Sequence, residues 1–279
     1  MKAITKGELS SNKQLNFESI KWSIDNLDYL NKPMRLFGSS TKVEKGSDKF
    51  DTYIMYLQPH NKVAINTLCI AANSSGCSEP CLISSGQLGM SVGQRAATKR
   101  TILLLLRPDW FKAQLLVEID KAEVKANKTK IPALFRLNGT SDVDFSDVIK
   151  ERPKSTFYDY SKILSRVTKN NLTNYDITYS ASMFSLQSRN AFKKALKRKH
   201  RIAVAFNTKG ITRDQLSIPK RMESFDDTDL RHLDGFNTVG YLKRKGSSIN
   251  ERNIENKKTN SFFVTSANYN EFIDLYLFS

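Results

Sequence analysis

The sequence has only three cysteines among its 279 residues, and all three lie between Cys69 and Cys81. An odd number of closely spaced thiols does not build a disulfide framework, although one disulfide and one further thiol is an alternative. The longest uninterrupted apolar run, 102–106, is far too short for a membrane span, and the N-terminus lacks the apolar segment of a signal peptide. We therefore expect a cytoplasmic protein that does not enter a membrane.

Acidic residues are scarce relative to basic ones. The chain has 28 Asp and Glu against 44 Lys and Arg, a formal net charge of +16 at pH 7. Such an excess attracts polyanions, and nucleic acid is the natural candidate partner. Because the charge is spread along the chain, a basic composition without such a partner is the alternative. The densest cluster is predicted to contact phosphates: Lys193, Lys194, Lys197, Arg198, Lys199 and Arg201. Its place at the end of a predicted helix also has a structural explanation, since cations favour the helix C-terminus.

The apolar content is sufficient for one large domain. Hydrophobic residues make up 39% and charged residues 26% of the chain, which is typical of globular proteins. Residues 1–50 are polar and weakly periodic, and we interpret them as an N-terminal extension. Residues 51–279 would form a single α/β barrel-like domain with a core at 63–246 and an irregular C-terminal segment.

Strand-like and helical segments alternate along the middle of the chain. Residues 52–59 and 62–68 predict a strand pair, and helices are predicted to begin at Ser91 and at Pro108. Four further strand-like runs follow, with helical or turn segments between them: 133–139, 155–161, 174–180 and 201–207. This alternation predicts βαβ units and a parallel sheet. The fold class that we expect is a partial or irregular βα barrel.

Polar residues follow the predicted strands. In parallel α/β folds the carboxyl ends of the strands carry the ligand site, so these residues should lie on one rim. Each of them alone has a second explanation as a helix cap or turn residue. The rim residues are Asn138, Ser141, Asp142, Asp159, Lys162, Ser180 and Ser182.

The cysteines have the spacing C-x7-C-x3-C. Thiolates bind zinc or iron–sulfur clusters, and a closed zinc site would need a fourth ligand such as His60. A [4Fe–4S] cluster held by three cysteines leaves one iron open, which resembles the arrangement in radical S-adenosylmethionine enzymes. Those enzymes carry the cysteine loop after the first strand of a partial βα barrel, but their main group has the spacing C-x3-C-x2-C. Chance clustering of small buried residues is the third explanation.

Several motifs in order resemble the phage gene-product-88 family. They are "LCIAANSSGCSEPCLISSG", "VGQRAATKRTILLLLRPDWF", "FRLNGTSDVDF", "TFYDYSK", "YDITYSAS" and "DDTDLRHLDG…VGYLKRKG". The similarity runs from Val63 to Gly246 and implies a phage or prophage origin, hence the host cytoplasm, and a cysteine-bearing βα fold. It implies no particular reaction. Members often carry an aromatic residue after the third cysteine, where this chain has Leu82.

The matching positions suggest roles on physical grounds. Cys69, Cys77 and Cys81 would bind a [4Fe–4S] cluster, or zinc in the alternative. The residues that would hold S-adenosylmethionine are Asn138, Ser141, Asp142, Ser180 and Ser182. Asp159 and Lys162 would position a substrate or move a proton. Alternation along a strand, however, turns Asp159 away from the site if Tyr158 and Tyr160 face it.

Two functional hypotheses follow. The first is a phage-encoded iron–sulfur protein, an enzyme of the radical type that acts on a nucleotide, a nucleic acid or a protein. The second is a noncatalytic nucleic-acid-binding protein with a zinc-stapled loop. The acidic segment 223–235 binds a cation or caps a turn, and the sequence leaves both interpretations open.

Overall fold

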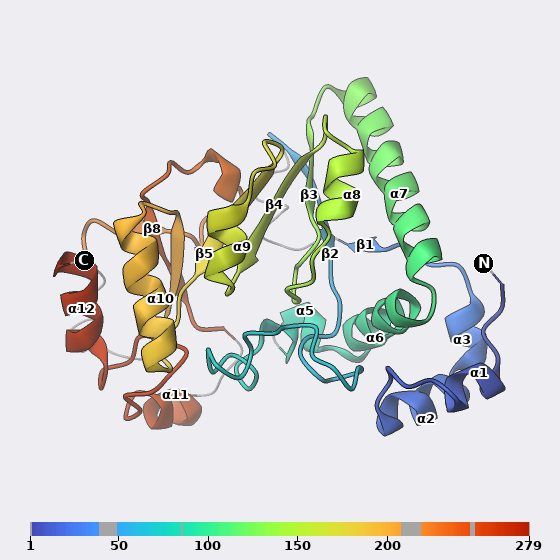
Figure 1. The fold of residues 1–279 in the computed structure, drawn as a ribbon, viewed down its shortest axis with the longest axis horizontal. Coiled ribbons are helices and arrows are strands. Elements are labelled where there is room, and N and C mark those ends of the chain that lie inside the picture. The colour runs from blue at the N-terminus through green and yellow to red at the C-terminus, as the bar shows by residue number, and fades with distance from the viewer. Residues whose placement is uncertain (1, 39–48, 85, 208–218, 246–248, 279) are drawn as a thin grey trace.

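The structure is a computed structural model that describes residues 2–38, 49–84, 86–207, 219–245 and 249–278. Part of the predicted extension, residues 39–48, lies outside these residues. In the described chain, eight strands form one sheet (Figure 1). They are β1 (Phe37–Gly38), β2 (Asp51–Met55), β3 (Ala133–Arg136), β4 (Thr156–Ser161), β5 (Tyr175–Ser180), β6 (Ile202–Phe206), β7 (Glu223–Ser224) and β8 (Val239–Lys243).

Helices precede, connect and follow the strands. Those before the third strand are α1 (Lys6–Ser10), α2 (Phe17–Asp25), α3 (Leu27–Asn31), the 3-10 helix η1 (Leu82–Ser84), α5 (Gly86–Gly89), α6 (Ser91–Leu106) and α7 (Pro108–Thr129). The later ones are α8 (Ser146–Glu151), α9 (Leu164–Lys169), α10 (Leu186–Lys197), the 3-10 helix η2 (Arg231–Leu233), α11 (Ile249–Glu255) and α12 (Tyr269–Phe278).

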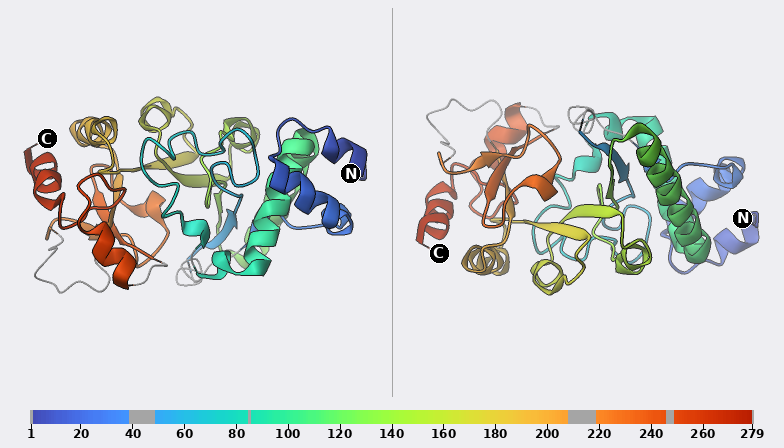
Figure 2. Two further views of the ribbon diagram at one scale, coloured as in Figure 1. Left: turned by 90° about the horizontal axis from the view of Figure 1, so that it is seen from below. Right: turned by 90° about the horizontal axis from the view of Figure 1, so that it is seen from above.

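Strands β2, β3, β4, β5, β6 and β8 run parallel and cross the sheet in chain order. The full order is β1-β2-β3-β4-β5-β6-β8-β7, with β1 antiparallel to β2. Crossover connections between parallel strands are right-handed, so a sheet that grows in one direction carries its crossover helices on one face. Helices α8, α9 and α10 accordingly lie on the same face of the sheet in Figure 1 and in both views of Figure 2.

Most elements of this parallel unit agree with the sequence predictions. The helices predicted to begin at Ser91 and Pro108 are confirmed as α6 and α7, and Pro108 occupies the first turn, where its missing N–H removes no helical hydrogen bond. The four predicted strand runs contain β3, β4, β5 and β6. The prediction of a strand at 62–68 is wrong. Its backbone pairs with the N-terminal segment instead, since Val63 accepts a hydrogen bond from the amide of Asn16.

The helix-covered face of the sheet forms the main core. Phe135 of β3 and Phe157 of β4 are fully buried in the cluster that contains Phe111 of α7. Val204 of β6 packs in a second cluster with Phe192 of α10. The large apolar residues that alternate along each strand therefore point outward, toward the helices.

The sheet is open, with β1 and β7 at its edges, so the structure does not confirm a barrel. The fold is mixed α/β with a mostly parallel sheet. The sheet nevertheless curves (Figure 2). Residues that follow β2 line the same cavity as residues that follow β8, although β3, β4, β5 and β6 separate these strands in the sheet. The face opposite the helices is therefore concave.

The N-terminal residues belong to the same core as the sheet. Leu9, Leu30 and Leu36 are fully buried in the cluster that also holds Phe111 and Ile119 of α7. The division of the chain at residue 50 stays a prediction. Over the described residues, we find no helix with both the length and the apolar character that a membrane span needs.

Candidate functional site

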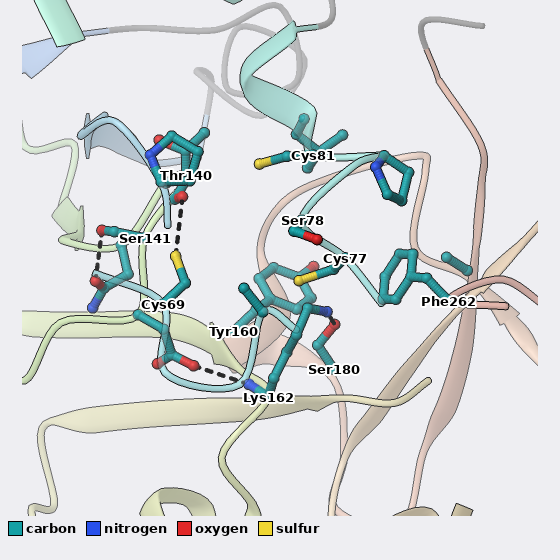
Figure 3. Close-up of a pocket in the computed structure, with 18 of the residues that line it drawn as sticks. Cys69, Cys77, Ser78, Cys81, Thr140, Ser141, Tyr160, Lys162, Ser180 and Phe262 are labelled. Carbon is teal, nitrogen blue, oxygen red and sulfur yellow. Dashed lines mark hydrogen bonds between the residues drawn. The ribbon is translucent and has the colours of Figure 1, made fainter. Parts of the chain in front are cut away.

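A cavity of about 270 Å³ lies beside the cysteine segment, residues 69–81 (Figure 3). Its walls come from the segments that follow β2, β3, β4 and β8, from the end of β5, from β6 and from residues 262–263. Loops from several strands meet at this edge of a parallel sheet, so it is where such folds bind ligands. Most of the predicted rim residues line the cavity, namely Asn138, Ser141, Asp142, Lys162 and Ser180.

Cys69, Cys77 and Cys81 all line this cavity, and their sulfur atoms face a common space in Figure 3. Burial raises the pKa of the Cys69 thiol to about 12 and also raises that of the Cys81 thiol, and charge on neighbouring cysteines raises both further. The thiols are thus close enough to influence one another. All three are described, and none forms a disulfide.

The cysteine loop is fixed by hydrogen bonds to the segment that follows β5. Ser182 Oγ donates to the carbonyl oxygen of Ser75 at 2.6 Å, and Ser188 Oγ donates to that of Ser74 at 3.0 Å. Gly76 has a φ of +66°, and a Cβ atom at this position would lie 2.3 Å from the ring of Phe184. The loop therefore needs glycine at this point both for its backbone conformation and for the close packing of Phe184.

His60 lines the cavity on the side of β2, with its ring Nδ1 3.0 Å from the hydroxyl of Thr67. In the described part of the chain, however, no three His, Cys, Asp or Glu side chains are grouped closely enough to hold one metal ion. The predicted set of three cysteines with His60 thus shares a cavity but does not form a closed site for a single ion.

Lys162 extends into the cavity from the end of β4. Its Nζ donates a hydrogen bond to Ser180 Oγ at 2.9 Å and lies 4.1 Å from the centre of the Phe262 ring (Figure 3). Its amide donates to the carboxylate of Asp142 at 3.1 Å. Ser180 and Phe262 thus hold the ammonium group, and Asp142 anchors the backbone that carries it.

Asn138, Ser141 and Asp142 form a connected network at the end of β3. Ser141 Oγ donates to Asn138 Oδ1 at 2.9 Å, and Asp142 pairs with Arg166 while accepting from the hydroxyl of Ser161 at 3.0 Å. Burial raises the pKa of Asp142, and Arg166 opposes this shift. Much of the hydrogen-bonding capacity of these side chains is thus used in shaping the rim.

Two predicted site residues lie outside the lining of the cavity. Asp159 points to the helix-covered face, where its carboxylate accepts from the amide of Asn138 at 2.8 Å and from the hydroxyl of Tyr175 at 3.1 Å. Tyr160 lines the cavity instead, as strand alternation requires. Ser182 supports the cysteine loop from behind. Neither Asp159 nor Ser182 is placed to contact a ligand in the cavity.

The predicted phosphate-contacting cluster divides in two. Its first five cations are exposed on α10 and just beyond it: Lys193, Lys194, Lys197, Arg198 and Lys199. Arg201 is buried, pairs with Asp176 and donates to the carbonyl oxygen of Asp234. Arg201 therefore holds β5 and β6 to a neighbouring loop and is not available to a phosphate.

The acidic segment 223–235 supplies partners to cations of the same chain. Asp229 accepts from Arg136 Nη1 at 2.9 Å and from the hydroxyl of Tyr158 at 3.0 Å. Asp226 accepts from the amide of Lys243 at 2.7 Å and pairs with Lys245 at 3.2 Å. These contacts favour the interpretation of the segment as a structural element over that of a cation site.

Sequence reasoning did not single out several residues of the cavity wall. Arg136 lies over the ring of Tyr160, 4.8 Å from its centre, Lys243 ends β8, and Arg244 and Lys245 follow it. Alternation along β3 and β4 puts Arg136 and Tyr160 on one face of the sheet. The strand pattern could therefore have indicated that both residues line the site. Phe262 reaches the cavity from a segment distant in sequence, and no local pattern indicates it.

A model of the gene product 88 family matches residues 32–261. The chain belongs to the gene product 88 family. The match includes every strand of the sheet and the cysteine segment, so the family resemblance seen in the sequence is confirmed over a wider range. Comparison with curated proteins and with solved structures finds no significant match. A likeness to radical S-adenosylmethionine enzymes therefore remains a prediction.

Proposed function

We propose that this member of the gene product 88 family binds a [4Fe–4S] cluster through Cys69, Cys77 and Cys81 and is an enzyme of the radical S-adenosylmethionine type. One observation carries the proposal: all three thiols line one cavity at the carboxyl edge of the parallel strands. Cysteine thiolates are the usual ligands of iron–sulfur clusters. Three such ligands leave one iron of a four-iron cluster open to a small chelating molecule.

A cluster and a single ion place different demands on the thiols. Zinc requires its ligands to converge on one point, with each sulfur about 2.3 Å from the metal. The described residues contain no group of three side chains that converges in this way. In a cluster, each thiolate binds a different iron, so the cysteines need a common cavity rather than a common point. Cys69, Cys77 and Cys81 share such a cavity, which supports the choice of a cluster.

The direction in which the sheet is built also supports the proposal. The cysteine segment follows β2, the first of the parallel strands, and the sheet then grows strand by strand in chain order. This winding curves the sheet around the cavity, as in a barrel that has not closed. A cofactor above the strand ends would then be reached by loops from β3, β4, β5 and β8.

Lys162 is the side chain best suited to bind an anionic group of a ligand in the cavity. Its ammonium is held by Ser180 and the ring of Phe262, so it needs little reorganisation to accept a carboxylate. The hydrogen bonds of Asn138, Ser141 and Asp142 keep the adjoining rim in place. When bound, a reduced cluster with an open iron supplies an electron to a sulfonium cofactor, and the protein orients the ligands. Thiols of this kind require a reducing compartment, which agrees with the cytoplasmic location that we propose.

The proposal is tested by S-adenosylmethionine cleavage. Protein that has been reconstituted anaerobically with iron and sulfide is reduced with dithionite, and 5′-deoxyadenosine is measured by chromatography. We expect the nucleoside from the wild type and none from Cys77→Ala. The matched control is Ser74→Ala, since Ser74 lies in the same loop but its side chain is exposed and bonds only locally, at 3.3 Å to Ala71. It should retain product formation.

Two outcomes contradict the proposal in different ways. A brown protein that releases no 5′-deoxyadenosine would contain the cluster without the enzymatic reaction. A colourless protein with one zinc per chain would instead support the noncatalytic, zinc-stapled alternative, in which His60 supplies the fourth ligand.

A further inference from the structure

The cavity has a second, cationic side that the proposed cluster does not use. Lys243, Arg244 and Lys245 line it from the end of β8, and Lys62 lines it from the segment after β2. Lys62 and Lys162 both act electrostatically on the Cys81 thiol, which places them near the cysteine segment. Cations therefore reach the cavity from both ends of the curved sheet.

The carboxylates that line the cavity do not neutralise these cations, although Lys245 pairs with Asp226, which lies outside the lining. Asp142 and Asp229 are its acidic lining residues within the described chain, and each pairs with an arginine, Arg166 and Arg136 respectively. Among the described residues, neither Lys62 nor Lys243 has a carboxylate partner; both are exposed, and some of the atoms of each residue line the cavity. An excess of positive charge thus remains at the mouth, and a site lined by one sign of charge attracts ligands of the other.

The same cavity has an apolar floor and wall. Ala203 and Ala205 of β6 and Leu242 of β8 leave room on the concave face, and the rings of Phe262 and Phe263 form the adjoining wall, 5.0 Å apart. Small side chains beside aromatic rings accept a flat, apolar group. The complete cavity therefore suits a ligand that combines a ring with more than one negative charge.

We propose that the cationic side of the cavity binds a nucleotide unit, with its phosphate near Lys62 and Lys243 and its ring against Phe262. Nucleotides combine a flat ring with phosphate, and the net charge of +16 favours the approach of polynucleotides from a distance. The proposal that a nucleotide binds depends on the cavity alone, whereas the assignment of that nucleotide as the substrate rests on the proposed radical function. The bound unit is either a free nucleotide or one nucleotide within a single strand.

The test measures binding by fluorescence anisotropy and calorimetry with protein that has or has not been reconstituted with iron. The probes are thymidine monophosphate, a single-stranded DNA oligonucleotide and polyglutamate of similar charge. The oligonucleotide has about 12 nucleotides, since single-strand binding sites have roughly this length. The test variant is Lys62→Gln/Lys243→Gln. The matched control is Lys121→Gln/Lys128→Gln, which removes the same charge from the exposed surface of α7. Melting temperatures of both variants should equal that of the wild type.

We expect the test variant to bind the nucleotide probe about tenfold more weakly, while the control retains wild-type affinity. With the oligonucleotide, the slope of log affinity against log salt concentration should fall by about 1.4 for two lost phosphate contacts. If only the oligonucleotide binds, the source is a strand. If the monophosphate binds as well, a free nucleotide suffices. Both results support the proposal.

Three results would overturn it. They are the absence of binding by either nucleotide probe, equal loss of affinity in the α7 control, and binding of polyglutamate as tight as that of the oligonucleotide. Since binding is measured with and without iron, these results are independent of the cluster. A protein that binds nucleotides through Lys62 and Lys243 but contains no cluster would refute the radical function and leave the nucleotide site intact.

Discussion

The two faces of β4 have opposite surroundings. Phe157 and Asp159 point toward the helices and are almost fully buried, Phe157 in the main core and Asp159 in a hydrogen-bond network with Asn138. Tyr158 and Tyr160 point to the concave face, where the hydroxyl of Tyr158 bonds to Asp229 and Tyr160 lines the cavity. One strand thus stabilises the fold through one face and lines a ligand-sized cavity with the other.

Truncation of the helix-facing side should have the largest effect. Phe157→Ala removes a fully buried ring from a core that cannot collapse around the gap, so the free energy of unfolding should fall by about 3–5 kcal/mol. Tyr160→Phe, on the other face, retains its ring and should change that free energy by less than about 0.5 kcal/mol. Urea denaturation measures both. Similar losses in the two variants would contradict the claim that the helix-facing side of β4 contributes more to stability than the concave side.

Titration of Asp159 provides a second contrast between the faces. Burial raises the pKa of Asp159 from 3.8 to about 6. The folded state then holds this proton more tightly than the unfolded state, so the group stabilises the fold increasingly as the pH falls from about 6 to about 4. The amide side chain of Asp159→Asn does not titrate in this pH range. The free energy of unfolding of the wild type minus that of the variant should therefore rise on acidification, by up to about 3 kcal/mol.

Denaturation of the two proteins at a series of pH values between about 7 and 4 checks this sign. The difference between wild type and variant removes the titration of other carboxylates. A difference that does not change with pH, or that falls on acidification, would mean that Asp159 is not buried against the helix-covered face.

The cysteine loop should depend on backbone conformation more than on core packing. Gly76→Ala introduces strain at a φ of +66° and a contact of 2.3 Å with Phe184, which should lower the free energy of unfolding by about 1–3 kcal/mol. Gly86→Ala is the matched control, because its φ of +56° is similar but no heavy atom lies within 4 Å of the new Cβ. The Gly76 variant should lose more stability and retain less iron. An equal effect of both substitutions would exclude Phe184 as a support of the loop.

The parallel fold could be predicted from the sequence because its signals are local. Pro108 marks the junction of α6 and α7, and the runs that contain β3 to β6 are short, apolar and followed by turn residues. The strand predicted at 62–68 failed because its backbone bonds to Asn16, a distant partner that propensity does not reveal. Closure into a barrel depends on the curvature of the whole sheet, which no single segment specifies.

The candidate site was predictable in part for the same reason. Cys69, Cys77 and Cys81 are neighbours in sequence, and the polar rim follows from the rule for parallel strands. Asp159 and Ser182 have side chains that could bind a ligand, but both point away from the cavity. They form hydrogen bonds to residues behind its lining instead. Lys62, Lys243 and Phe262 come together only through the curved sheet, so their shared cavity is a property of the tertiary structure.

The most direct test of this account is the metal content of the anaerobically purified and reconstituted protein. We expect about four irons and four sulfides per chain in the wild type, as in a [4Fe–4S] cluster, with a broad absorption in the visible region. Single Cys→Ala substitutions at residues 69, 77 and 81 should each remove most of the iron. Wild-type protein that binds no iron, or that keeps its iron when any one cysteine is replaced, would contradict the claim that the three thiols hold one cluster.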